Sequence, residues 1–396
     1  MDEIVQFDFP TDSPKIIKVI GVGGGGGNAV NHMYREGIHD VTFVLCNTDN
    51  QALAESPVPV KLQLGRSITQ GLGAGNRPER ARDAAEESIE DIKAQLNDGT
   101  KMVFITAGMG GGTGTGAAPV VARVAREMGI LTVGIVTKPF AFEGKRRMDQ
   151  AELGISALSE FVDSLVIIPN ERLKQVSESR ITLLNAFEIS DDVLRHGVQS
   201  ISELINVPGF VNLDFADVTA VMKDAGYAHM GVGEGTGKDK AEIAAKAAIS
   251  SPLLETSISG ANGILINITA SPDIGLEDID LASTMITNEA SDNATVIWGA
   301  SFDPELEDKM KITIIATGFA NDKEKLPKMD AKAAAPAPAQ EEKKAEVTAE
   351  ENEFAPTEEE KNGELPEVEP SAISEDDFNE LMGMLKKQKN PGNGGF

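Results

Sequence analysis

Residues Thr106 to Pro119 read TAGMGGGTGTGAAP and join two segments of different periodicity. The apolar run Met102 to Ile105 before them predicts a buried strand, and Val120 to Ala125 after them predicts a helix. We therefore expect a strand-loop-helix corner. A flexible linker is the alternative, but linkers are not usually flanked at once by a strand and a helix.

Six of the nine residues from Gly108 to Gly116 are glycine, which is more than an ordinary turn requires. Glycine loses more conformational freedom on folding than any other residue, so this composition indicates that something approaches the backbone closely. Without side chains, successive N–H groups can converge on one point, and the N-terminus of the following helix adds partial positive charge. The predicted ligand is a phosphate. The candidate contacts are Gly110, Gly111, Gly112, Thr113, Gly114 and Thr115, the two threonines adding hydroxyl donors.

The stretch from Gly108 to Gly116 lacks the lysine of the common phosphate loop, G-x-x-x-x-G-K-S/T. A near match, Gly233 to Lys238, lacks the first glycine at the required offset and is followed by Asp239 where a hydroxyl residue belongs. Backbone amides, the helix dipole and a bound cation would then have to neutralise the phosphate charge.

The run from Gly108 to Gly116 resembles the signature loop of the tubulin superfamily, in the form found in the FtsZ family of bacterial cell-division GTPases. The resemblance extends over residues 15–320, with three motifs in the family's order. It implies an α/β fold in which a parallel-sheet GTP-binding domain is joined by a central helix to a smaller α+β domain. It also implies bound GTP or GDP with Mg²⁺, K⁺ being an alternative cation, and assembly with other copies into filaments.

Two further glycine-rich corners precede predicted helices. Lys15 to Ile20 predicts a strand that enters Gly21 to Val30, and Gly71 to Asn76 precedes a helix predicted from Pro78 to Leu96. Taken alone, the first corner also matches the dinucleotide-binding fingerprint. Three corners fit an open parallel sheet whose ligand lies outside the carboxyl ends of the strands. The nucleotide-binding candidates of the first corner are Gly24, Gly25, Gly26, Gly27 and Asn28.

Polar residues also follow the other predicted strands. Val41 to Leu45 is followed by Asn47 to Asp49, which either bind a ribose or cation or only form a turn. Ile130 to Thr137 leads to Glu143 and Arg147, which the resemblance implies contact the ribose and phosphates. Without the resemblance, these two residues would simply be the solvated start of a helix.

Guanine recognition is implied by the resemblance at Asn170, Phe187 and Asp191. Asn170 follows the predicted strand Ser164 to Ile168. A carboxylate that accepts from N1–H and the exocyclic amine of guanine discriminates against adenine. Asp191 is expected to open the central helix, where the helix dipole would favour its negative charge. Apolar residues of that helix recur on one face, at Leu194, Val198, Ile201 and Ile205.

The second chemical motif is Asn212 to Val218, which follows the central helix. From the residues alone, Asp214 and Asp217 fit the N-cap and third position of the next helix. The resemblance identifies the same residues, with Asn212, as the catalytic loop, and places that loop at the opposite end of the molecule from the nucleotide. One subunit's aspartates would then reach the γ-phosphate of another only by head-to-tail stacking, which does not close and so gives a filament.

Length and composition predict two domains plus extensions, since 396 residues with 41% hydrophobic content can bury two cores. The later part of the chain contains three apolar strands (263–268, 294–298 and 312–316), a helix from Asp239 to Ile249, and no histidine spacing typical of a metal site. The predicted segments are a disordered N-terminus (1–14), the GTP-binding domain with its central helix (15–206), the second domain (207–320), a disordered linker (321–371) and a partner-binding peptide (372–396).

The C-terminal segments differ from the rest in composition. Residues 321–371 are rich in Ala, Pro, Glu and Lys and cannot bury enough apolar surface to fold. From Ile373 to Lys387 apolar residues return at helical spacing behind Ser374, a typical N-cap. So short a helix is marginal alone, so we expect it to order in a partner's groove, a frayed tail being the alternative. The resemblance implies membrane-tethering and regulatory division proteins as partners. The peptide keeps Ile373 and Phe378 but departs from the family's pattern, which leaves the partner's identity open.

The net charge of −27 argues against binding of nucleic acid or anionic lipid by bulk electrostatics. Cys46, the only cysteine, precludes an internal disulfide and fits a reducing compartment. With neither a leader nor an apolar run of about 18 residues, a cytoplasmic protein without direct membrane insertion is expected. The resemblance places it at the mid-cell division ring.

Three other functions remain open. A dinucleotide-dependent oxidoreductase would use the first glycine corner alone and bind NAD. A structural filament protein would polymerise without turnover, and a plasmid-segregating relative of tubulin would share the signature loop.

Overall fold

A parallel sheet lies at the centre of the first half of the protein. The computed structural model describes residues 15–176, 182–206, 214–254, 257–271, 274–291, 293–303 and 306–319. In sheet order the first strands are β3 (Val60–Gln63), β2 (Val41–Asn47), β1 (Ile17–Val22), β4 (Met102–Gly108), β5 (Leu131–Lys138) and β6 (Ser164–Pro169). Every neighbouring pair among these six is parallel, so their carboxyl ends share one edge.

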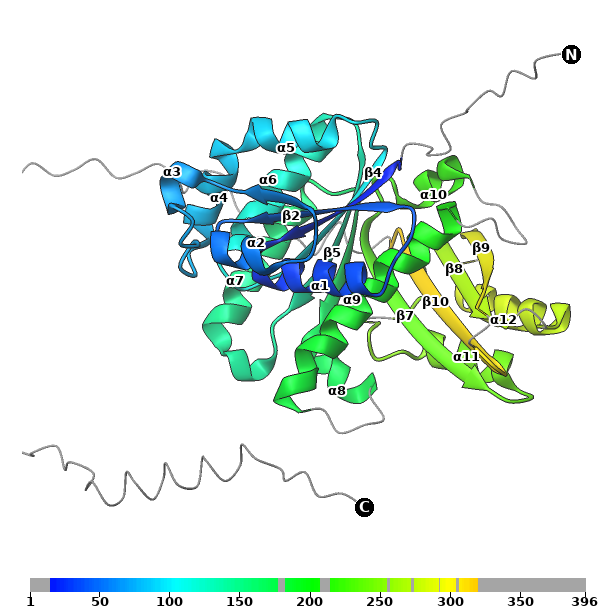
Figure 1. Ribbon diagram of the computed structural model, residues 1–396. Coiled ribbons are helices and arrows are strands. Elements are labelled where there is room, and N and C mark those ends of the chain that lie inside the picture. The colour runs from blue at the N-terminus through cyan, green and yellow to red at the C-terminus, as the bar shows by residue number, and fades with distance from the viewer. Residues whose placement is uncertain are drawn as a thin grey trace, which may run out of the picture. The chain divides into compact units, whose positions relative to one another are not determined.

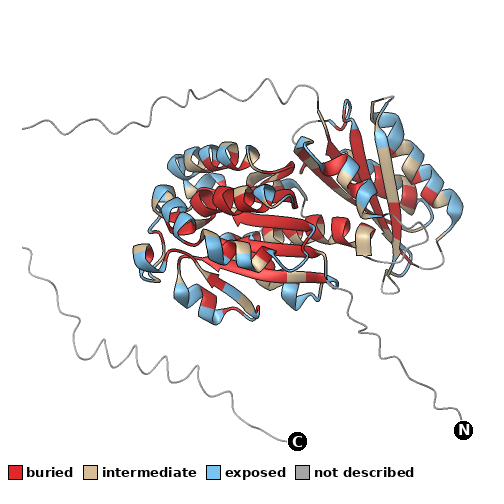
Figure 2. Cartoon of the chain, turned by 90° about the horizontal axis from the view of Figure 1, so that it is seen from above, coloured by how far each residue is buried: buried red, intermediate tan, exposed pale blue. Residues whose placement is uncertain are grey.

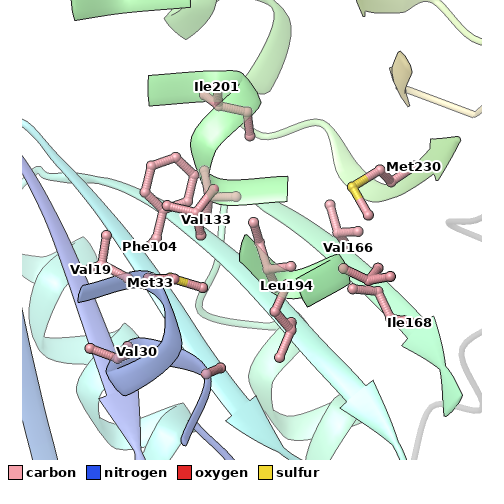
Figure 3. Packing of buried hydrophobic residues seen from close by; sticks show 14 of the residues in the cluster. Val19, Val30, Met33, Phe104, Val133, Val166, Ile168, Leu194, Ile201 and Met230 are labelled. Atoms are coloured by element: carbon pink, nitrogen blue, oxygen red, sulfur yellow. The ribbon is translucent and has the colours of Figure 1, made fainter. Parts of the chain in front are cut away.

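Helices cover both faces of this sheet (Figures 1 and 2). Because successive side chains of a strand point to opposite faces, Val19 of β1 joins one apolar cluster and Ile20 joins the other. The first cluster includes Met33 of α1 and Leu194 of α9 (Figure 3). The second is built with α4 to α7. The helices are α1 (Gly23–Arg35), α2 (Asn50–Glu55), α3 (Arg66–Thr69), α4 (Pro78–Glu87), α5 (Ile89–Leu96), α6 (Thr113–Glu127), η1 (Ala141–Glu143), α7 (Lys145–Ser159), η2 (Asn170–Arg172), α8 (Leu173–Val176) and α9 (Leu183–Asn206).

The long helix α9 is followed by a mixed α/β region. Its helices are α10 (Phe215–Met222), α11 (Lys240–Ile249) and α12 (Leu276–Glu289), and its strands are β7 (Gly226–Thr236), β8 (Gly263–Ala270), β9 (Thr295–Phe302) and β10 (Lys309–Thr317). β7 pairs in parallel with β6 and antiparallel with β10, so the ten strands of the described residues form one continuous sheet. The predicted fold class is confirmed, and Ile201 of α9 belongs to the same apolar cluster as Leu265 and Ile315 of this region.

β7 was not among the predicted strands, because its glycines resemble a loop. Gly231, Gly233 and Gly235 alternate along one face of β7, where α11 packs directly on the backbone. A Cβ atom on Gly233 would lie 2.2 Å from the carbonyl oxygen of Ala244. The alternation therefore permits close packing of helix on strand, and the near match to a phosphate loop at 233–238 begins in this strand. β3 and α12 were also not predicted.

Helix boundaries differ from the predictions at three places. α6 begins at Thr113 rather than Val120, so the second half of the glycine run forms its first turns. α9 begins at Leu183, which makes wrong the expectation that Asp191 opens the central helix. The helix predicted from Pro78 to Leu96 is broken at Ser88, whose hydroxyl accepts from the Gly65 amide at 2.9 Å.

The predicted disordered N-terminus, the linker, the C-terminal peptide with Ile373 to Lys387, and Asn212 all lie outside the described residues. Cys46 is buried, and burial raises the pKa of its thiol to about 12. No helix in the described ranges has the length and apolar character needed to cross a membrane.

Candidate functional site

Two helix N-termini meet at the carboxyl edge of the parallel sheet. α1 begins directly after β1, and α6 begins a short loop after β4. A Cβ atom on Gly23 would lie 2.7 Å from the amide nitrogen of Gly114, so the two first turns are in contact. The first N–H groups of a helix have no partner within that helix, and two such sets beside each other form a site for an anion.

The glycines of the first corner divide into two kinds. A Cβ atom on Gly26 would lie 2.2 Å from the Thr106 carbonyl oxygen, and one on Gly25 would lie 3.1 Å from the backbone of Gly108. These two glycines let α1 pack directly on the backbone of β4. Gly24 and Gly27 have no atom within 4 Å of the corresponding position, so their open sides are available to a ligand. Asn28 is exposed next to them.

The signature loop is held by its own threonine and by α7. The Gly110 amide donates to Thr115 Oγ1 at 2.8 Å, so this hydroxyl is used inside the loop. Gly110 has a φ of +98°, and a Cβ atom there would lie 2.5 Å from the Arg147 carbonyl oxygen. The corresponding position on Gly111 is 3.9 Å from Arg147 Nη2, which places this guanidinium beside the loop.

The third glycine corner is tied to the end of β2 and reaches the same loop. The Gly73 amide donates to the Thr48 carbonyl at 3.1 Å, and Thr48 Oγ1 lies 2.7 Å from Thr113 Oγ1. A Cβ atom on Gly112 would lie 3.1 Å from Ala74 Cβ. Asp49, in contrast, caps α2 by accepting from the amides of Gln51 and Ala52, so it has the turn-forming role that was the alternative.

Glu143, the last residue of η1, pairs with Arg147 in the first turn of α7. Glu143 Oε1 accepts from the Phe140 amide at 2.9 Å, and Glu143 Oε2 lies 3.2 Å from Arg147 Nη1. The Glu143 side chain is 9% exposed, and that of Arg147 is 48% exposed. Glu143 therefore fixes the local chain, while the guanidinium is accessible to a ligand.

The proposed guanine-binding residues lie on η2 and α9. Asn170 is buried, and its Oδ1 accepts from Ser190 Oγ at 2.9 Å. Phe187 is 43% exposed and lies edge-on to Phe140, with ring centroids 5.5 Å apart. Ser190 and Phe140 were missed from the sequence, because neither residue belongs to a recognisable pattern.

Asp191 lies next to Ser190 in the interior of α9, more than two turns from its start. Burial and the nearby Glu188 carboxylate raise the pKa of Asp191 to about 7. The helix N-terminus therefore does not stabilise its charge as the sequence had suggested. An ionised Asp191 can accept two hydrogen bonds, whereas a protonated one presents a donor.

Asp214 and Asp217 form a reciprocal cap at the start of α10. Asp214 Oδ1 accepts from the Asp217 amide at 2.9 Å, and Asp217 Oδ2 accepts from the Asp214 amide at 3.2 Å. This arrangement is a capping box, the structural alternative drawn from the sequence. Both side chains are exposed, so capping leaves them accessible.

α10 lies at the amino ends of the strands, away from the glycine loops. Phe215 and Thr219 line a cavity of about 340 Å³ with Leu131 and Asp163, which lie at the starts of β5 and β6. β4 has seven residues, so at roughly 3.3 Å per residue the two ends of the sheet are about 20 Å apart. Figure 1 shows α10 at the end where the chain enters β1, and α3 at the other end. The aspartates and Gly110 to Thr115 do not line one cleft.

Two protein-family models match this chain. Residues 16–178 match the Tubulin/FtsZ family GTPase domain, and residues 226–320 match the FtsZ family C-terminal domain. The cell division protein FtsZ of Buchnera aphidicola subsp. Schizaphis graminum (strain Sg) is 55% identical over 309 residues, which cover 78% of this chain and 80% of that protein. The chain belongs to the FtsZ family. The FtsZ of Wigglesworthia glossinidia brevipalpis is 52% identical over 312 residues, covering 78% and 81% of the two chains.

Solved structures agree with membership of the FtsZ family. An empty FtsZ dimer from M. jannaschii is 43% identical, with a TM-score of 0.73, and covers 76% of this chain and 88% of its own. GDP-bound monomeric CetZ1 from Haloferax volcanii has a TM-score of 0.66 at 19% identity, over 77% of this chain and 94% of its own, which shows the fold alone. The FtsZ resemblance read from the signature loop is confirmed, and the first half of the chain is a tubulin-like GTPase domain.

Proposed function

We propose that this FtsZ family member hydrolyses GTP at a site that two subunits complete. GTP binds at the carboxyl edge of the parallel sheet of one subunit. Asp214 and Asp217 of the next subunit in a head-to-tail filament orient the attacking water at the γ-phosphate, with Asn212 in the same network. The observation that carries this proposal is the placement of the two groups at opposite ends of β4.

The phosphates would be held mainly by the backbone. The first turns of α1 and α6 offer unpaired amides, and the open sides of Gly24 and Gly27 leave room for phosphate oxygens. Gly111 and Gly112 would supply further amides, whereas the Gly110 amide is already bonded to Thr115 Oγ1 and holds the loop in shape. Arg147 would supply an exposed charge. Such a site acts by positioning and charge stabilisation, which is how most phosphoryl-transfer enzymes work.

The guanine base would be recognised at the carboxyl edge of the parallel sheet, next to α9. In our proposal the Phe187 ring stacks on guanine, and Asn170 and Asp191 hydrogen-bond to its polar edge. Asp191 must be ionised to accept from both N1–H and the exocyclic amine. Glu143 contributes indirectly, because it holds Arg147 and the Phe140 backbone.

A cation is the proposed second component. Among the described residues no group of three or more His, Cys, Asp or Glu side chains could hold a metal. The hydroxyl of Thr113 at the α6 N-terminus fits a hard cation that takes oxygen ligands, and Mg²⁺ in such sites keeps waters and phosphate oxygens as ligands. Bound Mg²⁺, or K⁺ as the alternative, would neutralise phosphate charge.

Filament formation follows from the same separation. A contact between the glycine edge of one copy and the acidic edge of the next is heterologous, so it propagates instead of closing. We propose that these filaments form the bacterial division ring on the cytoplasmic side of the membrane. The segment from Ile373 to Lys387 would attach them to membrane-tethering and regulatory proteins, without insertion of this chain in the membrane.

Two rival functions fit the geometry less well. A dinucleotide-dependent oxidoreductase uses one glycine corner. Here the corners after β1 and β4 are in contact, and the third corner, Gly71 to Asn76, adjoins the loop after β4. A plasmid-segregating relative would share the GTPase domain, but the match to the FtsZ C-terminal domain favours a division protein.

Phosphate release per subunit, measured as a function of protein concentration, tests the proposal. A shared site predicts a negligible rate at high dilution and a steep rise once filaments form. A rate per subunit that stays constant down to nanomolar protein would contradict it. GDP binding measured at the same dilutions separates a loss of assembly from a loss of nucleotide.

A further inference from the structure

Two threonine hydroxyls meet where β2 ends and α6 begins. Thr48, directly after β2, has its Oγ1 atom 2.7 Å from Oγ1 of Thr113, the first residue of α6. Thr48 is fully buried, whereas Thr113 is only partly buried. The other threonine of the signature loop, Thr115, is buried, and its hydroxyl accepts from the Gly110 amide inside the loop. Thr113 is therefore the better placed of the two loop threonines to contact a ligand.

The position of Thr48 is fixed by the backbone around it. Its carbonyl oxygen accepts from the Gly73 amide at 3.1 Å and from Thr69 Oγ1 at 3.2 Å. The next residue, Asp49, caps α2 through its side chain. None of these contacts uses the Thr48 hydroxyl, so they hold the residue in place and leave that hydroxyl to Thr113.

Burial decides which of the two hydroxyls donates. A threonine hydroxyl has one proton and two lone pairs. Among the residues that the structure describes, Thr113 Oγ1 is the one hydrogen-bond partner of Thr48 Oγ1. A buried donor without a partner is costly and rare, so the Thr48 proton should be used in this contact. Thr48 then donates, Thr113 accepts, and the proton of Thr113 is directed away from Thr48.

We propose that Thr48 is a positioning residue, which donates to Thr113 Oγ1 and so directs the Thr113 proton towards an oxygen of the nucleotide phosphates. A hydrogen bond to a charged phosphate oxygen is stronger than one between neutral groups. Holding the hydroxyl in its bound orientation lowers the entropy lost on binding. One lone pair of Thr113 stays available to the proposed cation. The inference rests on the phosphate site proposed at the first turns of α1 and α6.

Equilibrium binding of GTPγS, a slowly hydrolysed GTP analogue, tests this role at protein concentrations below assembly. Thr48→Val removes the hydroxyl and should weaken binding about threefold to tenfold, the effect of one neutral hydrogen bond. Thr48→Ser keeps the hydroxyl and should bind as the wild type does. Wild-type affinity in Thr48→Val would overturn the inference. An equal loss in Thr48→Ser would assign the effect to packing of the methyl group.

Thr106→Val is the matched control. Thr106 of β4 is also fully buried, but its hydroxyl has no hydrogen-bond partner in the described part of the chain. The same exchange of hydroxyl for methyl should therefore leave GTPγS binding unchanged. A loss as large as that of Thr48→Val would show that any such exchange in this part of the sheet disturbs the site, and would contradict the specific role of Thr48. Thermal unfolding of each variant verifies that it is folded.

A double-mutant cycle shows whether Thr48 acts through Thr113. Thr113→Val should weaken binding about tenfold or more, because it removes the bond to a charged phosphate. The variant with both valines should bind no more weakly than Thr113→Val alone, whereas losses that multiply would mean independent roles and overturn the inference.

The same measurements separate this inference from the proposed function. If Thr113→Val binds GTPγS as the wild type does, the proposed phosphate contact of Thr113 fails together with the role of Thr48. If Thr113→Val loses affinity and Thr48→Val does not, only the positioning role fails. Binding at these concentrations needs no second subunit, so a failure of the shared GTPase site would not affect the result.

Discussion

Asp214 and Asp217 each accept a hydrogen bond from the other's backbone amide across the first turn of α10, at 2.9 and 3.2 Å. The two carboxylates therefore stabilise the helix while their exposed oxygens face the solvent. A substitution that removes both the carboxylate and the cap cannot separate these roles. Serine at position 214 and glutamine at position 217 keep the cap without the charge.

We therefore predict different results for two substitutions of Asp214. Asp214→Ala should lose about 1 kcal/mol of stability through the missing cap and should also lose GTPase activity. Asp214→Ser should keep the stability but lose about 100-fold or more in phosphate release, the usual size of a lost acid-base or water-orienting group. Thermal unfolding and steady-state phosphate release on both variants make the comparison.

Asp239→Ser is the matched control. Asp239 is the N-cap residue of α11, but its side chain makes no capping hydrogen bond, so neither stability nor activity should change. If Asp214→Ser released phosphate at the wild-type rate in filaments, Asp214 would have only a capping role.

Gly24 and Gly26 should respond differently to the same added methyl group. Gly26→Ala would place Cβ 2.2 Å from the Thr106 carbonyl oxygen and should destabilise the protein by about 1–3 kcal/mol, the range of overpacked cores. The Cβ atom of Gly24→Ala would have no atom within 4 Å, so this variant should keep or slightly raise the unfolding free energy. Its methyl group should nevertheless obstruct the phosphates and weaken GTP binding.

Chemical denaturation and GDP titration on the two alanine variants test this prediction. Gly37→Ala is not a suitable control, because Gly37 has a positive φ of +70°. Gly27→Ala is a better second test of the phosphate site. A Cβ atom on Gly27 would also have no atom within 4 Å, and Gly27 lies in the same helix turn as Gly24. Unchanged GDP affinity in both Gly24→Ala and Gly27→Ala would place the phosphates elsewhere.

Much of this site was predictable because backbone, not side chains, forms it. The glycine runs at 23–27 and 108–116 are visible in the sequence, and the strand before each run fixes the edge of the sheet on which it lies. The partners of the signature loop were not predictable in the same way. That the Thr115 hydroxyl is used by Gly110 depends on loop geometry, which composition does not encode.

Misplaced boundaries have similar physical causes. The helix start at Thr113 was hidden because glycine is a poor helix former, yet packing of α6 between α4 and α7 overrides that preference. The strand β7 was hidden because glycines at 231, 233 and 235 provide space for α11. In both cases a tertiary contact requires the residue that local propensity disfavours.

Asp191 should make guanine nucleotide binding depend on pH near neutrality. Its pKa in the nucleotide-free protein is raised to about 7, and guanine requires the ionised form as acceptor. GDP affinity should therefore be constant above pH 8 and fall below pH 7, approaching tenfold per pH unit. The raised pKa of Asp191 also affects folding. The free energy of unfolding should decrease as the pH rises from the pKa of Asp191 in the unfolded chain towards 7, because the folded state binds the proton more tightly.

Equilibrium GDP binding between pH 5.5 and 8.5 checks this dependence. Asp191→Asn should bind GDP more weakly at pH 8 and lose the fall below pH 7. Asp280→Asn, an exposed carboxylate on α12, should retain the wild-type profile. A pH profile unchanged by Asp191→Asn would assign the titration to another group and remove Asp191 from the base site.

Mixed filaments provide the sharpest test of a site shared by two subunits. A variant with Asp214→Ser and Asp217→Gln keeps its own GTP pocket but offers no carboxylates to its neighbour. Gly24→Ala keeps the carboxylates but binds GTP poorly. Each should be nearly inactive alone, for different reasons that lie at opposite ends of the sheet.

Mixed in equal amounts, the two variants should recover activity that neither has alone. Random incorporation places an intact pocket against an intact pair of aspartates at about one interface in four, because a head-to-tail contact joins one end of each subunit. Phosphate release from the mixture should therefore approach a quarter of the wild-type rate. Light scattering on the same samples confirms that filaments form. If the filaments form and the mixture only sums the two single rates, each active site belongs to one chain, and the aspartates of α10 act outside the chemical step.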